Sequence, residues 1–168
     1  METPTCPHSA GRPNQSDEVA TGKHSLSTRE TARRLIDSRR AEQSEPNGRA
    51  RTVAFACDAL NRELSRWVGP DGCHALFKRS ITQARTESGA LDKIQLRPGA
   101  DPYVEGVEES IRSHGDAATA AALETVLVNV IELLGRLVGD TMATKLIERS
   151  IAPARHGDAT SNDRREEA

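Results

Sequence analysis

The fold of this chain is decided by residues 117–138, which read AATAAALETVLVNVIELLGRLV. Apolar side chains recur there at spacings of three and four, in two neighbouring sets: Leu123, Val126, Val130, Leu133 and Leu137, and Leu127, Ile131, Leu134 and Val138. This spacing is typical of an α-helix, and two adjacent apolar sets make a face too wide for one neighbour. We therefore expect a helix that is capped by Asp116, ends at Gly139 and packs centrally among several others.

Further helices are expected on both sides of this one. Apolar residues at helical spacing, with capping residues and Gly or Pro stops, predict helices over residues 51–68, 71–88, 101–114 and 140–151. The third rests on Asp101-Pro102, because a capping residue followed by proline is typical of a helix start. Residues 90–100 fit either a short extended segment or a last helical turn, and no alternation typical of strands is found. The sequence thus predicts an all-α fold, an antiparallel bundle of four to five helices over residues 49–152.

The two ends of the chain are more polar than this domain. Of the 168 residues, 36% are hydrophobic and 2% are aromatic, and the formal net charge is −2. Residues 1–26 and 153–168 have few large apolar side chains, so they are predicted to be a disordered arm and a disordered tail. Residues 27–48 have good helix formers but few large apolar side chains. They are predicted to be a conditional helix or linker.

Several features indicate a water-soluble protein of the cytoplasm. Three cysteines without framework spacing argue against a disulfide-stapled secreted fold, and the first residues lack the pattern of a signal peptide. Charged residues interrupt the apolar stretch 117–138, so we do not expect it to span a membrane. Cys57 and Cys73 lie in apolar register and are predicted to be buried, with Trp67 as a lid over the core.

Charge is distributed unevenly along the chain. Residues 51–97 carry eight basic and five acidic side chains, whereas residues 101–134 carry seven acidic side chains and one basic. Mutual attraction between layers of one bundle is the simpler interpretation, because exposed charges are individually weak. The functional hypothesis is a patch that recruits a basic protein partner. Its residues are Glu105, Glu108 and Glu109.

A second charged group is the arginine cluster within residues 29–40. Acidic side chains dilute this cluster, and no aromatic residue is interleaved for stacking on bases. Together with the small net charge, this makes nucleic-acid binding an unfavourable hypothesis, and we interpret the cluster as part of a solvated linker. Its members are Arg29, Arg33, Arg34, Arg39 and Arg40.

The segment 74–79, His-Ala-Leu-Phe-Lys-Arg, is the main candidate for chemistry. Histidine phosphotransfer domains are helical bundles in which an exposed histidine precedes a leucine, a lysine and a small residue. His74 and Lys78 lie four residues apart and so share a helix face, but Lys78 comes one residue late, and Arg79 stands where a small residue is expected. A phosphoacceptor role for His74 with Lys78 is therefore an alternative hypothesis.

Other kinds of site find little support in the sequence. Bundle metal sites use paired Glu-x-x-His motifs, and none occurs, so no metal site is expected. Phosphate-binding glycine loops and the Gly-x-Ser-x-Gly nucleophile motif are also absent, and no cofactor is expected.

Two helix joints resemble known sequences. The segments 67–79, with WVGPDG followed by LFKR, and 133–140, LLGRLVGD, are similar to segments of small helical proteins from bacteria to which no activity is attached. The resemblance extends over residues 51–151. It implies one helical domain and transfers no activity.

These observations lead to three functional expectations. The first is a non-catalytic regulatory or adaptor domain that binds a protein partner, or a second copy of itself, through an apolar helix face. The alternatives are a phosphotransfer intermediate using His74 and a helical domain that binds a small ligand. A cavity with converging ionisable groups would favour a further class, an enzyme with a pocket lined by the bundle.

Overall fold

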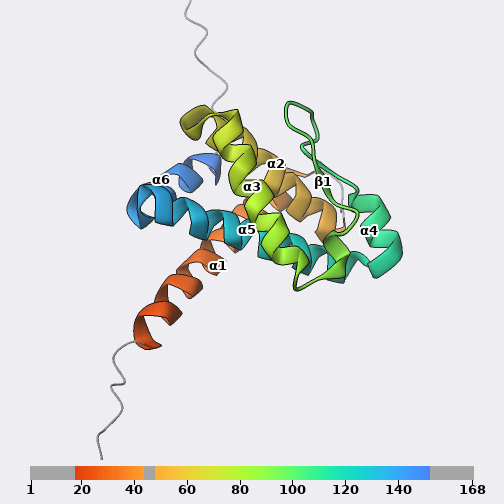
Figure 1. The fold of residues 1–168 in the computed structure, drawn as a ribbon, viewed down its shortest axis with the longest axis horizontal. Coiled ribbons are helices and arrows are strands. Elements are labelled where there is room, and N and C mark those ends of the chain that lie inside the picture. Colours follow the sequence, from red (N-terminus) through yellow and green to blue (C-terminus); the bar gives the residue numbers. More distant parts are fainter. Residues whose placement is uncertain (1–17, 44–47, 152–168) are drawn as a thin grey trace, which may run out of the picture.

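The computed structural model describes residues 18–43 and 48–151, with side chains from residue 27 onward (Figure 1). In chain order, the elements are α1 Glu18–Glu42, α2 Arg49–Val68, α3 Pro70–Arg85, a 3₁₀ turn Gly89–Leu91, β1 Gln95–Leu96, β2 Val104–Glu105, α4 Val107–His114, α5 Asp116–Val138 and α6 Asp140–Ile151. The all-α prediction is confirmed. The predicted four to five helices are corrected to six within the described ranges.

The predicted central helix is α5, and every other described helix packs against it. Both apolar sets contribute buried side chains, among them Val126, Leu127, Val130 and Leu134. By length and hydropathy α5 would also be able to cross a membrane, but half of that window is buried inside the protein. Its wide apolar face is therefore largely covered by neighbouring helices.

Helix α1 corrects the predicted boundaries at the N-terminal side. Residues 18–26, assigned to the disordered arm, are helical, and residues 1–17 and 153–168 lie outside the described residues. Most of the predicted linker is also helical, and it packs against α2, α5 and α6. Ala32, Leu35 and Ile36 are buried in the common core. Three apolar side chains are enough here because three helices enclose them.

A two-stranded hairpin replaces the start of the predicted helix 101–114. β1 and β2 are antiparallel, with Gln95 opposite Glu105 and Leu96 opposite Val104. The helix begins only at Val107, where α4 starts. Asp101-Pro102 carries a local helix signal, but pairing of Val104 with Leu96 overrides it. Each strand has two residues, too few to show an alternating pattern.

Gly106 makes the sharp change from β2 to α4 possible. Its φ is +84°, a conformation that favours glycine, and a Cβ at this position would lie 2.0 Å from the backbone oxygen of Lys93. The hairpin and α4 can therefore pack closely only with glycine at this joint.

Asp116 has a different role from the predicted one. It is the first residue of α5 and does not cap that helix. Its carboxylate instead accepts hydrogen bonds from the backbone N–H groups of Arg49 (3.0 Å) and Ala50 (3.1 Å), at the N-terminus of α2. A carboxylate is favourable there because it satisfies free N–H groups and complements the helix dipole.

The prediction for Trp67 is wrong, whereas those for the two cysteines are confirmed. Cys57 and Cys73 are buried, but 52% of Trp67 is exposed. Trp67 lies in the last turn of α2, and the guanidinium of Arg149 in α6 stacks 4.7 Å from its ring centroid. A cation over its face stabilises an indole that the core does not enclose.

Candidate functional site

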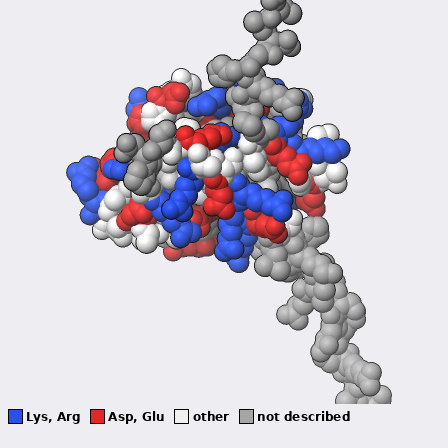
Figure 2. Space-filling model, turned by 180° about the vertical axis from the view of Figure 1, so that it is seen from behind, with Lys and Arg blue, Asp and Glu red and all other residues white. Residues whose placement is uncertain are grey.

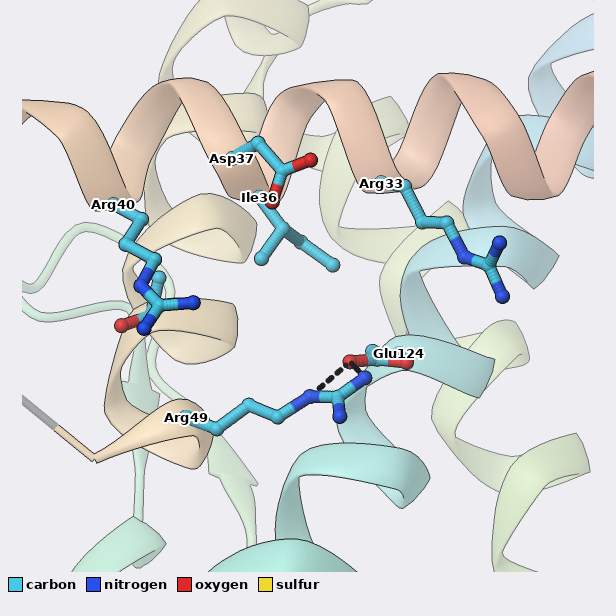
Figure 3. A pocket seen from close by; sticks show the side chains of 7 residues that line it. Arg33, Ile36, Asp37, Arg40, Arg49 and Glu124 are labelled. Carbon is cyan, nitrogen blue, oxygen red and sulfur yellow. Dashed lines mark hydrogen bonds and ion pairs between the residues drawn. The ribbon is translucent and has the colours of Figure 1, made fainter.

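An open pocket of about 350 Å³ lies between α1, the first turns of α2 and the middle of α5 (Figure 3). Its lining combines three guanidinium groups with two carboxylates, one aliphatic side chain and a threonine: Arg33, Ile36, Asp37, Arg40, Arg49, Thr52 and Glu124. This volume is at the lower end of the range for small-molecule sites.

Helical spacing on α1 places four of these residues on one side of the helix. Positions 33, 36, 37 and 40 are three or four residues apart, so they share one face of α1. Ile36 is buried and anchors this face on the core. Figure 3 shows Arg33 and Arg40 extending from α1 toward the side of the pocket that holds Arg49.

Arg49 is fixed on the opposite side by two interactions. Its backbone N–H donates to Asp116, as described above, and its side chain donates to Glu124 of α5 through Nε (2.9 Å) and Nη2 (2.7 Å). This charge-assisted pair holds the guanidinium at the edge of the pocket. Arg49 and Glu124 lie 75 positions apart in the sequence, so only the packing of α2 on α5 brings them together.

The pocket holds a surplus of positive charge. Neither Arg33 nor Arg40 forms an ion pair with another described residue, whereas their neighbours Arg34 and Arg39 pair with Glu30 and Glu42 of the same helix. With Arg49 paired to Glu124, two guanidinium groups and the single carboxylate of Asp37 remain. Guanidinium groups bind phosphate and carboxylate oxygens in bidentate geometry, so this arrangement is suited to a small oxyanion.

A second hollow continues from this pocket along α1. It has a volume of about 410 Å³ and shares Arg33, Ile36 and Glu124 with the first. Its other lining residues include three acidic or amide side chains: Glu87, Asn129 and Glu132. The positive surplus is therefore confined to the first pocket.

A separate polar cleft of about 320 Å³ lies between α2, α3 and the loop that precedes β2. Asp58, His74 and Tyr103 reach it from these three segments. The Asp58 carboxylate accepts a hydrogen bond from the backbone N–H of Val104 (3.0 Å), and the Tyr103 hydroxyl lies 2.9 Å from Nδ1 of His74. These three side chains thus already have partners within the protein, which is typical of a structural network.

Burial changes the acidity of groups around this cleft. Loss of solvation raises the pKa of the Asp58 carboxyl to about 6, although backbone N–H groups of Val104 and Tyr103 act in the opposite direction. Burial likewise raises the pKa of Cys73 to about 11 and shifts the pKa of the Tyr103 hydroxyl upward. These thiol and phenol groups therefore remain protonated at neutral pH, which does not favour nucleophilic chemistry.

The structure separates the environments of the predicted phosphoacceptor residues. His74 is half-buried, and one of its ring nitrogens already faces Tyr103. Lys78 is exposed one turn further along α3. No hydrogen bond links His74 to Lys78 among the described residues. The phosphoacceptor role stays a prediction.

Each acidic residue of the predicted partner patch lies beside an arginine of the same chain. Glu105 is 3.3 Å from Arg97, Glu108 is 2.6 Å from Arg51, and Glu109 is 3.4 Å from Arg112. The hydrogen bond from Arg51 lowers the pKa of Glu108. Part of the negative charge is therefore balanced within the molecule, which weakens attraction of a basic partner.

The sequence contained a partial signal for the arginine pocket. The spacing of Arg33, Ile36 and Arg40 places them on one face of a helix. Because residues 27–48 were interpreted as a conditional helix or linker, no other helix was expected to pack against that face. The contribution of Arg49 had no local signal at all. In the part of the chain that the structure describes, no group of three His, Cys, Asp or Glu side chains has the arrangement of a metal site.

Comparisons with known proteins identify no relative of this chain. No family model matches it, and neither the curated proteins nor the solved structures contain a match.

Proposed function

We propose that this chain is a helical ligand-binding domain whose pocket beneath α1 holds a small ligand bearing a phosphate or carboxylate group. The observation that carries the proposal is that Arg33, Arg40 and Arg49 line one hollow, with no ion-pair partner for the first two among the described residues. Guanidinium groups are a common way to hold an oxyanion.

The surroundings of the pocket support a small ligand over a nucleic acid. On the face shown in Figure 2, basic and acidic side chains are interspersed, with no wide area of positive charge. A nucleic acid needs a basic stripe that follows its backbone, whereas one small anion needs only a local surplus. No histidine, cysteine or lysine lines the pocket, which favours binding over catalysis.

The proposal is tested by titrating the full-length protein with inorganic phosphate at constant ionic strength. Isothermal calorimetry should show saturable binding, and the melting temperature should rise, because a ligand that binds only the folded state stabilises it by about 2.7 kcal/mol at a concentration of 100 Kd. The double substitution Arg33→Gln with Arg40→Gln should abolish both effects. Arg79→Gln, which removes one positive charge at an exposed position of α3 outside the pocket, should preserve them. Equal binding by wild type and the double variant would overturn the proposal.

A second candidate function is association with another copy of the chain. It is favoured by exposed apolar side chains at the junction of α5 and α6, where Leu137 is 69% exposed and Met142 is 52% exposed. Val138 lies between them and is also exposed. Apolar groups gathered at one turn are typical of interaction surfaces.

A further inference from the structure

The attachment of α1 to the remainder of the protein has a distinctive composition. Three buried apolar side chains, Ala32, Leu35 and Ile36, seat the helix. One side-chain hydrogen bond joins it to α6, from Ser38 Oγ to the backbone oxygen of Ile151 (3.2 Å). Among the described residues, the ion pairs of α1 all lie within that helix, so none of them holds α1 to a neighbour.

On the α1 side, the pocket carries more positive than negative charge. Arg33 and Arg40 extend from α1 at opposite ends of the hollow, and Arg49 lies between them on the other side (Figure 3). The Glu124 carboxylate already accepts two hydrogen bonds from Arg49, and Asp37 supplies one further negative charge. The charge of Arg49 is thus balanced by Glu124, and one positive charge on the α1 side has no counter-charge among the residues that line the pocket.

We infer that an anion in this pocket locks α1 onto the protein, so that occupancy of the pocket controls how firmly α1 is docked. The inference rests on the proposed function and adds its regulation. An anion that contacts Arg33 or Arg40 of α1 together with Arg49 of α2 can do so only when α1 is docked, because these residues line one hollow. Because it binds that state more tightly, it shifts the population toward docked α1.

The experiment measures amide hydrogen exchange of the full chain with inorganic phosphate and with chloride at matched ionic strength. In wild type, phosphate should slow exchange of the backbone amides of residues 30–42 by about threefold or more. Amides in the middle of α5 should exchange at the same rate in both salts, because α5 stays packed whether or not α1 is docked. Calorimetry on the same samples reports binding independently.

Two variants separate anion binding in the pocket from other effects of the charges on α1. The double variant Arg33→Gln with Arg40→Gln lacks the guanidinium groups through which α1 contacts the anion, so its α1 amides should exchange at the same rate with and without phosphate. Arg34→Gln removes one charge from the outer side of the same helix, where Arg34 pairs with Glu30, and it should keep the phosphate response. If circular dichroism shows that the double variant loses helix, Arg40→Gln alone is used.

The outcomes distinguish the two proposals. Absence of phosphate binding overturns both. Binding without a change in α1 exchange overturns the lock and leaves the proposed function standing. A phosphate response of α1 exchange that persists in the double variant also overturns the lock, because the anion then does not act through Arg33 and Arg40.

Discussion

Asp58 shows how a single buried carboxyl holds the hairpin in place. It lies in α2, is 8% exposed, and accepts the backbone N–H of Val104 at the start of β2. Burial favours the neutral acid, whereas the N–H donors favour the carboxylate. Burial has the larger effect, so the pKa of this group rises to about 6.

Protonation of Asp58 should make the protein more stable in mild acid. In the unfolded chain this carboxyl ionises near its ordinary pKa of 3.8, whereas in the folded chain its pKa is about 6. Between these values the folded state retains a proton that the unfolded state has lost, so lowering the pH from 7 to 5 favours folding. Part of the carboxyl is solvated, so we expect a gain on the order of 1 kcal/mol, less than full linkage would give.

Urea denaturation at pH 5, 6 and 7 measures this effect. Asp58→Asn keeps a side-chain oxygen that can accept the hydrogen bond but does not titrate, so it should reduce the difference between pH 5 and pH 7. An unchanged pH dependence in this variant would show that groups other than Asp58 are responsible.

Among the secondary-structure elements, the hairpin and α4 depend on contacts that are distant in the sequence. β2 pairs with β1, its backbone binds Asp58 of α2, and α4 follows through Gly106. In α4, the hydroxyl of Ser110 donates to the backbone oxygen of Ala90 (2.6 Å). It also lies 2.8 Å from the hydroxyl of Thr119 in α5. These buried bonds join α4 to the 3₁₀ turn and to the N-terminal part of α5.

The loss of stability on substituting a glycine in this region should depend strongly on the atoms that surround the glycine. Gly99 and Gly106 both have positive φ, but a Cβ at Gly99 meets no atom within 4 Å, whereas one at Gly106 meets the Lys93 backbone. Gly99→Ala should therefore cost about 1 kcal/mol from backbone strain alone. Gly106→Ala should cost more than about 2 kcal/mol, because backbone atoms must also move. Chemical denaturation of both variants measures the difference in their free energies of unfolding. Equal losses would show that the Lys93 backbone moves away from the added Cβ at no cost.

The molecule as a whole balances much of its charge internally. The basic N-terminal turn of α2 lies against the acidic helices α4 and α5, through Arg51 with Glu108 and Arg49 with Glu124. These pairs are exposed, so each contributes little to stability, but together they reduce the fields that the uneven sequence distribution would create. Three exposed large apolar side chains, Leu137, Val138 and Met142, lie at the junction of α5 and α6, and Phe55 and Trp67 are exposed on α2.

This junction predicts self-association of the protein. Light scattering after size-exclusion chromatography should show a mass that rises with protein concentration, because burying Leu137 and Met142 between two copies removes apolar surface from water. Leu137→Asp should give a monomer at all concentrations. Ala118→Asp, also exposed on α5 but near its other end, should behave as wild type. A wild-type mass that stays monomeric throughout contradicts the second candidate function.

Prediction from the sequence succeeded best for long helices with regular apolar spacing. α2, α3, α5 and α6 lie close to their expected positions because such spacing reports directly which side of a helix is buried. It failed for α1 and Trp67. In α1 three apolar residues suffice because α2, α5 and α6 surround them, and Trp67 has apolar register but lies where α2 ends.

The sequence by itself determined the helical class and the central position of α5, since both follow from the order of apolar residues along a continuous segment. Only the tertiary structure decided the hairpin and the arginine pocket. Val104 meets Asp58, and Arg40 approaches Arg49 from another helix, because particular helix faces pack together. Convergence of polar groups depends on this packing, which local spacing does not encode.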